Sequence, residues 1–468
     1  MLCKLRLAGV LMAVVVIALV VGGASWGAGY DPSSDPNSMF ATTQYTGAQS
    51  WWDAGYTGSG IDVAVIDSGV SPVPGLNSPG KVIYGPDLSL ESQAPNLTNL
   101  DTFGHGTFMA GLIAADQGTG PASSANSSPS IYRGMAPGAR IVSIKVATAD
   151  GGTDVTQVIA AVDWVVQHAH DPGLNIRVLN LSYGTNSTQP YASDPLAYAV
   201  EQAWKHGIVV VAAAGNSGFQ RGSGAPGLAD PAYDPYVIGV GASDSMGTAT
   251  TRDDRVPDFS ASSGTAQGRN PDFVAPGSHL QGLRVPNSWI DVNHPEGMLD
   301  GIYFRGSGTS EAAAITSGAV ALVLQRYPQL TPDQVKAFFQ TNAVKLRGSG
   351  PAAQGSGEIS PTQMLTQTPP SASQTFGDST GNGSIEQARG TDRIALNGVV
   401  LSGEQDIFGK PVDTTALATA EANASSWSGG VWNGSSWSGS SWSGSSWSGS
   451  SWSGSSWSGS SWSDAAWT

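Results

Sequence analysis

Four polar residues stand among glycines and other small residues, at points where short apolar segments end or begin. Asp67 lies in "AVIDSGV", His105 in "GHGTFMAG", Asn216 in "AAAGNSG" and Ser310 in "GSGTSEAAA". A serine hydroxyl becomes a nucleophile when a histidine takes its proton, a buried carboxylate holds the imidazole tautomer, and hydrogen-bond donors receive the oxyanion. Each motif alone is short enough to arise by chance in a chain rich in glycine and serine. Together they fill all four roles and predict acyl transfer at Ser310.

Ser310 also has a purely structural interpretation. Serine and threonine at a helix start satisfy free backbone N–H groups, and the alanines that follow propagate a helix. The two interpretations are compatible, because a nucleophile at a helix entry has backbone donors at the point of attack. Further along, Thr331, Pro332 and Gln334 predict the start of another helix through a capping box.

Short apolar segments alternate with segments of helical spacing through the middle of the chain. The strand-like segments are "IDVAVID" (61–67), "ARIVSIKVA" (139–147), "IRVLNLSYG" (176–184), "IVVVAAAGN" (208–216) and "YVIGVGASD" (236–244). Residues 155–169 have helical spacing. This alternation predicts an α/β fold of three layers, with a mostly parallel sheet covered by helices on both faces. Chemistry in such folds gathers at the carboxyl ends of the strands, where Asp67, Ser182 and Asn216 are expected.

The composition and the first residues favour an extracellular protein. Of 468 residues only 12% are charged and the net charge is −15, which argues against a nucleic-acid partner. Lys4 and Arg6 precede an apolar run over residues 7–21, so residues 1–28 read as a signal peptide, with an uncleaved anchor as the alternative. The only cysteine, Cys3, lies in this leader. We therefore expect a secreted protein, with cell-surface association as the alternative, whose mature chain has no disulfide.

The motifs resemble those of the subtilisin-like serine proteases (subtilases), which carry the catalytic residues in the same order. The resemblance implies a subtilisin-like catalytic domain over residues 44–395. In it Asp67 orients His105, His105 acts first as general base and then as general acid, and Ser310 attacks the scissile carbonyl. Asn216 and the Ser310 backbone N–H hold the oxyanion.

The same resemblance implies where a substrate binds. "LSYG" (181–184) is expected to pair with an extended substrate backbone, and "AAAG" (212–215) to form one wall of the primary specificity pocket. Ser182 and Tyr183 also have a structural interpretation as ordinary strand-end residues. The substrate-binding residues implied are Ser182, Tyr183, Gly184, Ala213, Ala214 and Gly215.

No cofactor is expected. Structural calcium is common among subtilases, but the acidic loop "ADGGTD" (149–154) lacks the spaced carboxylates of an EF-hand, so no metal is assigned. His168 and His170 stand two residues apart on a predicted helix and therefore make a poor metal pair.

The chain departs from the subtilase pattern beside the nucleophile. Glu311 stands where the family usually has methionine, and Ala314 and Ile315 replace a proline and a histidine. We expect Glu311 to face solvent and to affect turnover little, because a carboxylate suits a helix N-terminus. An inward-facing Glu311 would instead place negative charge near the oxyanion. The segment ahead of residue 61 is also short for an inhibitory pro-segment, which leaves the activation route open.

The end of the chain is a repeat. From Trp427 to Trp467 a tryptophan recurs every five residues, nine in all, in units close to SSWSG. Serine, glycine and spaced tryptophans alone build no packed core, so we predict disorder over residues 422–468. The alternative is adhesion, with aromatic faces stacking on polysaccharide or cell wall. The remaining expected segments are a short N-terminal segment (29–43), a low-complexity insertion or linker (346–380) and a C-terminal extension (396–421).

These features together predict a secreted, monomeric serine endopeptidase that acts on protein or peptide substrates through an acyl-enzyme. The rival from another class is a catalytically idle subtilase-like scaffold that binds a surface or matrix through its tryptophan-rich tail. The lipase-type pattern G-x-S-x-G occurs in the leader ("GASWG", 23–27) and at "GDSTG" (377–381), in neither case directly after one of the strand-like segments that a nucleophile elbow requires, and HExxH does not occur. Both observations argue against other hydrolase classes.

Overall fold

The computed structural model of the protein describes residues 29–218, 227–263, 269–396 and 399–437. The chain divides into residues 1–30 and a compact unit over residues 31–468, and the fold given below is that of the second unit. The predicted signal peptide and the repeats beyond residue 437 lie outside the described residues. Among the described residues, no helix combines the length and the apolar character that crossing a bilayer requires.

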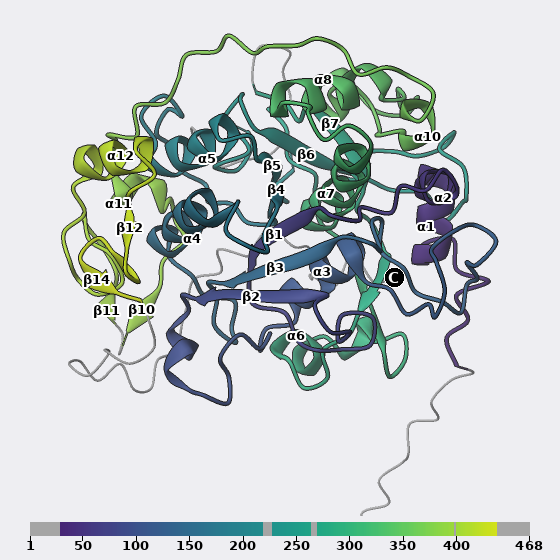
Figure 1. Ribbon diagram of the computed structural model, residues 1–468, viewed down its shortest axis with the longest axis horizontal. Coiled ribbons are helices and arrows are strands. Elements are labelled where there is room, and N and C mark those ends of the chain that lie inside the picture. Colours follow the sequence, from purple (N-terminus) through teal and green to yellow (C-terminus); the bar gives the residue numbers. More distant parts are fainter. Residues whose placement is uncertain (1–28, 219–226, 264–268, 397–398, 438–468) are drawn as a thin grey trace, which may run out of the picture. The chain divides into compact units, whose positions relative to one another are not determined.

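A seven-stranded parallel sheet forms the centre of this unit (Figure 1), in the order β2-β3-β1-β4-β5-β6-β7. The strands are β1 (Asp62–Asp67), β2 (Val82–Asp87), β3 (Arg140–Lys145), β4 (Ile176–Leu181), β5 (Val209–Ala213), β6 (Ile238–Ser243) and β7 (Phe273–Pro276). Every residue of β1, β5 and β6 is buried, which explains their nearly continuous apolar sequences. The predicted parallel sheet is confirmed.

Helices cover both faces of the sheet. On one face, α3 (His105–Ala114) packs against α7 (Thr309–Arg326), and α7 runs across β4, β5, β6 and β7. On the other, α4 (Val155–His168) packs against α5 (Pro195–Lys205), and Figure 1 shows this pair across the sheet from α3 and α7. The predicted three-layer arrangement is therefore confirmed.

The helix starts follow the capping residues in the sequence. The helix α8 (Pro332–Asn342) begins with the predicted capping box, in which Gln334 N donates to Thr331 Oγ1 at 3.3 Å and Gln334 Oε1 accepts from Thr331 N at 3.1 Å. Asp154 and Gln157 form a second capping box at the start of α4. These local bonds satisfy backbone N–H groups that the helices themselves leave open.

Shorter elements complete the unit. They are α1 (Met39–Thr46), α2 (Ala48–Asp53), η1 (Leu90–Gln93), β8 (Leu280–Leu283), α6 (Trp289–Asn293), η2 (Pro295–Gly297), β9 (Tyr303–Gly306), α9 (Pro351–Gln354), α10 (Pro361–Met364), α11 (Ile385–Ala388), β10 (Ala395–Leu396), β11 (Val399–Val400), α12 (Thr414–Ala422), β12 (Trp427–Ser428), β13 (Val431–Trp432) and β14 (Ser435–Ser436). The strands β8 and β9 form an antiparallel pair next to α3.

The low-complexity segment 346–380 contributes to the unit in its first half. Glu358 N donates to Val344 O at 2.8 Å, and Ile359 N donates to Val274 O of β7 at 2.9 Å. The buried indole of Trp51 donates to Pro361 O at 2.8 Å. After α10 the chain runs along the outside of the helices to α11 without regular structure (Figure 1).

The repeat begins as ordered structure, because β12, β13 and β14 form an antiparallel meander beside α4. Trp427 Nε1 donates to Ala160 O and Trp432 Nε1 to Asp163 Oδ2, both at 2.7 Å. Trp427, Trp432 and Trp437 are all buried. The predicted disorder is therefore wrong for residues 427–437, since two of the indoles form hydrogen bonds with α4 and the three tryptophan rings contact one another. Residues 438–468 lie outside the described residues.

Replacing Trp432 tests this packing. The indole is fully buried, so Trp432→Ala should lower the free energy of unfolding by about 3–5 kcal/mol. Denaturant titration followed by circular dichroism measures the change, and Trp289→Ala, at a position 40% exposed, serves as the control with a smaller expected loss. Equal midpoints for wild type and Trp432→Ala would contradict the packing.

Candidate active site

The imidazole of His105 lies against the carboxylate of Asp67. Asp67 is the last residue of β1 and His105 the first of α3. The ring nitrogen Nδ1 is 2.9 Å from both carboxylate oxygens, and each side chain is 1% exposed. A buried carboxylate at this distance favours the tautomer with the proton on Nδ1, which leaves Nε2 as the basic nitrogen.

The pKa of His105 reflects this pairing. Burial lowers it, but the charge of Asp67 and its hydrogen bond raise it, with further contributions from Glu311 and Asp101, so the pKa of His105 lies above its ordinary value. A base of this kind is protonated in mildly acidic solution. Hydrolysis that depends on His105 as a base should therefore increase with pH through the pKa of His105.

Glycines permit the close approach between α3 and the end of β1. A Cβ on Gly106 would lie 2.2 Å from Gly69 O and 3.0 Å from Asp67 Oδ1, so no larger residue fits. Gly104, the residue before α3, has a φ of +109°, a conformation that glycine adopts without strain. The first turn of α3 thus reaches the Asp67 carboxylate because both glycines flank His105.

Asp101 supports the histidine and was not identified from the sequence. Its carboxylate accepts hydrogen bonds from Gly104 N at 2.6 Å, Thr107 N at 2.7 Å and Ser68 Oγ at 2.8 Å. These bonds satisfy backbone donors in the first turn of α3 and link that turn to the residue after Asp67. The signal was present in "DTFGH", as an acidic residue just ahead of a helix start.

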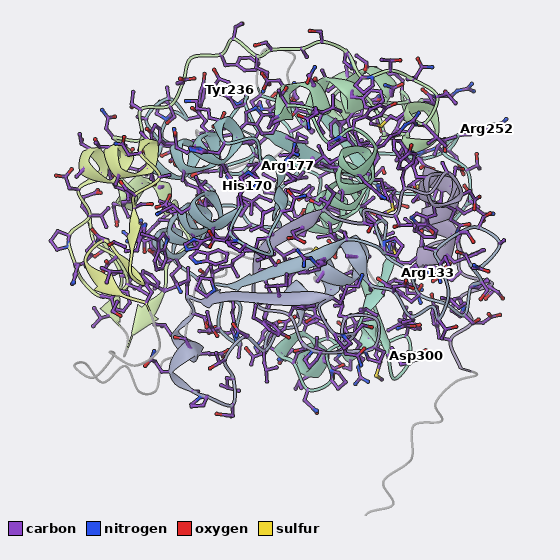
Figure 2. The ribbon with its side chains drawn as sticks, in the orientation of Figure 1. Arg133, His170, Arg177, Tyr236, Arg252 and Asp300 are labelled. Atoms are coloured by element: carbon purple, nitrogen blue, oxygen red, sulfur yellow. The ribbon has the colours of Figure 1, made fainter. Side chains whose placement is uncertain are left out.

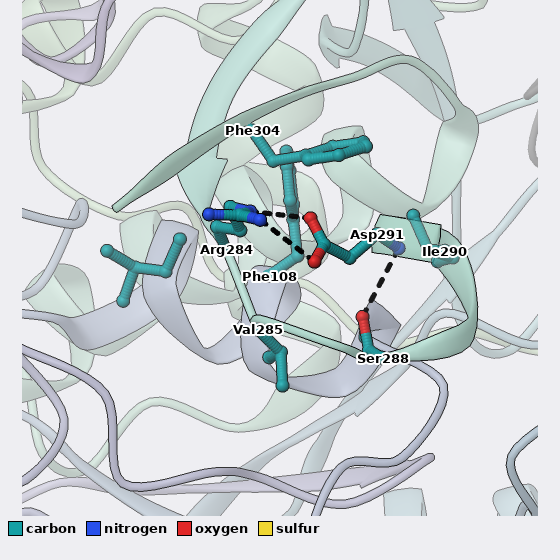
Figure 3. A pocket seen from close by; sticks show the side chains of 9 residues that line it. Phe108, Arg284, Val285, Ser288, Ile290, Asp291 and Phe304 are labelled. Carbon is teal, nitrogen blue, oxygen red and sulfur yellow. Dashed lines mark hydrogen bonds and ion pairs between the residues drawn. The ribbon is translucent and has the colours of Figure 1, made fainter. Parts of the chain in front are cut away.

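The start of α6 and the residues before it pack against the segment that leads into α3. Trp289 N donates to Thr102 O at 2.9 Å and Ile290 N to Phe103 O at 3.0 Å. Figure 3 shows the Arg284 guanidinium paired with the Asp291 carboxylate, with N–O distances of 2.5 and 3.0 Å. The pocket in this view lies beside Gly104 and Phe108. The pocket holds only about 10 Å³, which is too small for a substrate. The segment that lines it therefore serves to support α3.

Ser310 is the second residue of α7. Its hydroxyl lies 3.4 Å from Ser182 O, a long contact, while Ser182 Oγ donates to Ser310 O at 3.1 Å. Asn180 Nδ2 in turn donates to Ser182 Oγ at 2.9 Å. The end of β4 therefore fixes the backbone of the first turn of α7 and leaves the Ser310 hydroxyl weakly held.

Asn216 joins the same turn from the end of β5. Its Oδ1 accepts from both the backbone N and the hydroxyl of Thr309, each at 2.8 Å. A Cβ built on Gly308 would lie 3.1 Å from Asn216 Nδ2 and 3.7 Å from Ser310 N. The amide donor and the Ser310 N–H thus border one space beside Gly308, an arrangement suited to an oxyanion.

Both predicted substrate-binding segments form hydrogen bonds with this turn. The side chains of Ser182, Tyr183, Ala213 and Ala214 are buried, while Gly184 and Gly215 are partly exposed. Gly215 N donates to Thr309 Oγ1 at 3.0 Å, just as Ser182 bonds to Ser310. With these four side chains buried, the partly exposed groups of the two segments are at Gly184 and Gly215, which carry backbone atoms only.

The structure corrects the prediction made for Glu311. The prediction that it faces solvent is wrong, because its side chain is 0% exposed. The carboxyl lies close against two glycines: a Cβ on Gly306 would lie 2.6 Å from Oε1, and one on Gly308 2.7 Å from Oε2. Burial raises the pKa of Glu311 to about 7. A carboxyl therefore sits inside the site where the sequence suggested a surface group.

Other candidate groups take structural places. His168 stacks on Trp164 with a centroid distance of 4.6 Å, whereas His170 is exposed in the turn after α4 (Figure 2). In the acidic loop 149–154, Asp154 caps α4 and pairs with Arg389 at 2.6 Å. These side chains lie apart from the first turns of α3 and α7.

A buried Asp–His pair at the start of one helix and a serine at the start of a second helix packed against it, on a parallel sheet with helices on both faces, are typical of the subtilisin class of serine peptidases. The model of the subtilase family matches residues 58–378, and the chain belongs to this family. The chain is 38% identical over 307 residues to serine protease AprX of Bacillus subtilis, a match covering 65% of each chain. It is 31% identical to subtilisin DY of Bacillus licheniformis, covering 63% of this chain and 88% of the relative.

A solved structure agrees with this assignment. The crystal structure of fervidolysin from Fervidobacterium pennivorans, a keratinolytic enzyme related to subtilisin, matches with a TM-score of 0.53 and 26% identity. The match covers 74% of this chain and 46% of fervidolysin. The chain thus spans 65% of AprX and less than half of fervidolysin, so the shared part is the subtilisin-like fold.

Proposed function

We propose that the protein is a secreted serine endopeptidase that hydrolyses peptide bonds through Asp67, His105 and Ser310. The observation that carries the proposal is the buried contact of 2.9 Å between His105 Nδ1 and Asp67. The first turn of α3, which holds this histidine, belongs to a helix packed against α7, which holds Ser310. Membership of the subtilase family supports the same activity.

The reaction divides into acylation and deacylation. The Ser310 hydroxyl attacks the scissile carbonyl carbon while His105 Nε2 takes its proton, and Asp67 stabilises the imidazolium that forms. Asn216 Nδ2 and the Ser310 N–H donate to the oxyanion of the tetrahedral intermediate. His105 then gives the proton to the leaving amine, which departs and leaves the acyl-enzyme. Water repeats these steps against the ester, releasing the acid and restoring Ser310.

The substrates in this proposal are proteins or peptides bound in an extended conformation between residues 181–184 and 212–215. Main-chain pairing there allows many sequences to bind, because it engages groups that every peptide has. The leader-like residues 1–28 support an extracellular location. We propose a monomer that needs no cofactor for these steps. Contact with cell wall or polysaccharide would fall to the repeats after residue 437, because the first three tryptophans pack against the fold.

Active-site labelling tests the proposal. A serine-directed fluorophosphonate should label the folded protein, and peptide mapping should place the adduct on Ser310. Cleavage of a peptide library by the same preparation then gives the preferred sequences. Folded protein that neither labels nor cleaves would refute the endopeptidase and favour the idle scaffold.

Asn216→Leu tests the oxyanion assignment. The substitution removes the amide donor, so kcat should fall by about 100- to 1000-fold while KM changes little. Steady-state kinetics on a short fluorogenic peptide separates the two constants. A loss confined to KM would contradict the assignment, because a donor to the oxyanion acts mainly in the transition state.

A further inference from the structure

The Glu311 carboxyl is a buried titratable group that the proposed mechanism does not use. Its side chain is fully buried, and among the described residues no hydrogen bond reaches Oε1 or Oε2 from another residue. A carboxylate without donors is costly inside a protein, whereas the neutral acid is tolerated. The site therefore favours the protonated form of Glu311.

The carboxyl borders the space that the oxyanion donors face. A Cβ placed on Gly308 would be 2.7 Å from Glu311 Oε2, 3.1 Å from Asn216 Nδ2 and 3.7 Å from Ser310 N. On its other side, Gly306 separates Oε1 from the ring of Phe108, whose Cζ is 2.7 Å from the Cβ position on Gly306. The charge of Glu311 would therefore act at short range on an oxyanion formed there.

Few charged groups face Glu311 from the elements packed around it. His105 of α3 and Asp67 of β1 are the ones that act on its ionisation. Arg305 of β9 pairs instead with Asp35 at 2.8 Å, and Asn216 after β5 is neutral. Burial raises the pKa of Glu311 to about 7, His105 lowers it and Asp67 raises it. In turn, the Glu311 charge raises the pKa of His105, so the two groups titrate as a coupled pair.

We propose that Glu311 works as a neutral carboxylic acid in the active enzyme and that its ionisation sets the upper pH limit of peptide hydrolysis. This inference rests on the proposed function. Neutral Glu311 leaves the oxyanion donors unopposed. Ionised Glu311 places a negative charge beside the developing oxyanion, which disfavours the transition state. The same charge stabilises the imidazolium form of His105, so a smaller fraction of His105 is available as the free base.

The wild-type profile of kcat/KM against pH is therefore bell-shaped. On the acid side activity rises as His105 loses its proton, and on the alkaline side it falls as Glu311 loses its own. Between the two limbs the pair of His105 and Glu311 holds one proton, which can be on either residue. Only the form with neutral His105 and protonated Glu311 is active. A neutral amide at position 311 cannot ionise, so it should remove the alkaline limb.

The experiment compares kcat/KM on one uncharged fluorogenic peptide from pH 5 to 10 in wild type and Glu311→Gln. Active-site titration with the fluorophosphonate normalises each preparation to its active fraction. Relative to its own value at pH 7, Glu311→Gln should be at least about 10-fold more active than wild type at pH 9, about two units above the pKa of Glu311. Its acid limb should also move to lower pH, because Glu311 no longer raises the pKa of His105.

Glu421→Gln is the matched control. Glu421 is a buried glutamate on α12 with a raised pKa caused by burial, and α12 packs against α5 on the other face of the sheet. Its profile should coincide with that of wild type. A shift in Glu421→Gln equal to that of Glu311→Gln would overturn the inference, since a general effect of buried carboxyls on folding would then explain both.

The outcomes separate this inference from the function on which it rests. Wild type that labels and cleaves but shows no alkaline limb up to pH 10 overturns the role of Glu311 and leaves the endopeptidase intact. Superimposable profiles for wild type and Glu311→Gln do the same. Wild type that fails to label refutes the endopeptidase itself. The wild-type profile keeps the test decisive even where Glu311→Gln does not fold.

Discussion

Ser310→Ala should abolish peptide hydrolysis, with kcat/KM falling by about 10⁴- to 10⁶-fold. The hydroxyl oxygen forms the bond to the acyl group, and alanine has no atom that can replace it. The fold should survive, because alanine is a strong helix former and, within the described part of the chain, the hydrogen-bond contact of the Ser310 hydroxyl is a long one of 3.4 Å to Ser182 O. The loss is therefore chemical and not structural.

Kinetics, labelling and thermal melting together check this result. Ser310→Ala should neither hydrolyse the fluorogenic peptide nor take up the fluorophosphonate, while its melting temperature stays near that of wild type. Ser50→Ala, at an exposed position in the helix α2, is the control and should keep both activities. Labelling that persists in Ser310→Ala would place the nucleophile elsewhere in the chain.

The buried strands could be predicted because parallel strands covered on both faces require continuous apolar sequence. All five predicted strand segments contribute to the sheet, as β1, β3, β4, β5 and β6. The two strands that the sequence did not reveal are the edges of the sheet. Part of β2 is exposed and it contains Gly85 and Pro86, whereas β7 has only four residues and ends in Pro276. Edge strands carry a weaker apolar pattern and tolerate proline, so they give little signal.

Residues whose roles depend on distant partners could not be read from the sequence. The orientation of Glu311 is set by Gly306 and Gly308, whose missing side chains make room for its carboxyl. Local helix electrostatics suggested a surface position, and long-range packing overrode it. The tryptophans at the start of the repeat are a second example. The composition of the repeat does not reveal that α4 accepts hydrogen bonds from their indoles.

Asp67→Asn is expected to lower kcat by about 10⁴-fold while the side chains of the site keep their positions. Asparagine can keep the acceptor that Ser68 N uses, since Oδ1 receives that hydrogen bond at 2.7 Å. Its amide N–H then faces His105 Nδ1, which must accept, and the ring proton moves to Nε2. In that tautomer His105 cannot take the proton of Ser310, although every heavy atom remains close to its place.

The pH profile distinguishes this loss from general damage. Asp67 raises the pKa of His105 through its charge and its hydrogen bond, so in Asp67→Asn the remaining activity should depend on a histidine that loses its proton at lower pH. Asp413→Asn, at the cap of α12 where asparagine caps as well as aspartate, is the control and should retain wild-type kinetics. An acid limb unmoved in Asp67→Asn, with kcat near that of wild type, would mean that the Asp67–His105 contact does not set the base. Fluorophosphonate labelling also distinguishes the two variants. Asp67→Asn lacks the carboxylate that orients His105, so its labelling should be slow but measurable. Ser310→Ala lacks the hydroxyl that the probe modifies, so it should not be labelled at all.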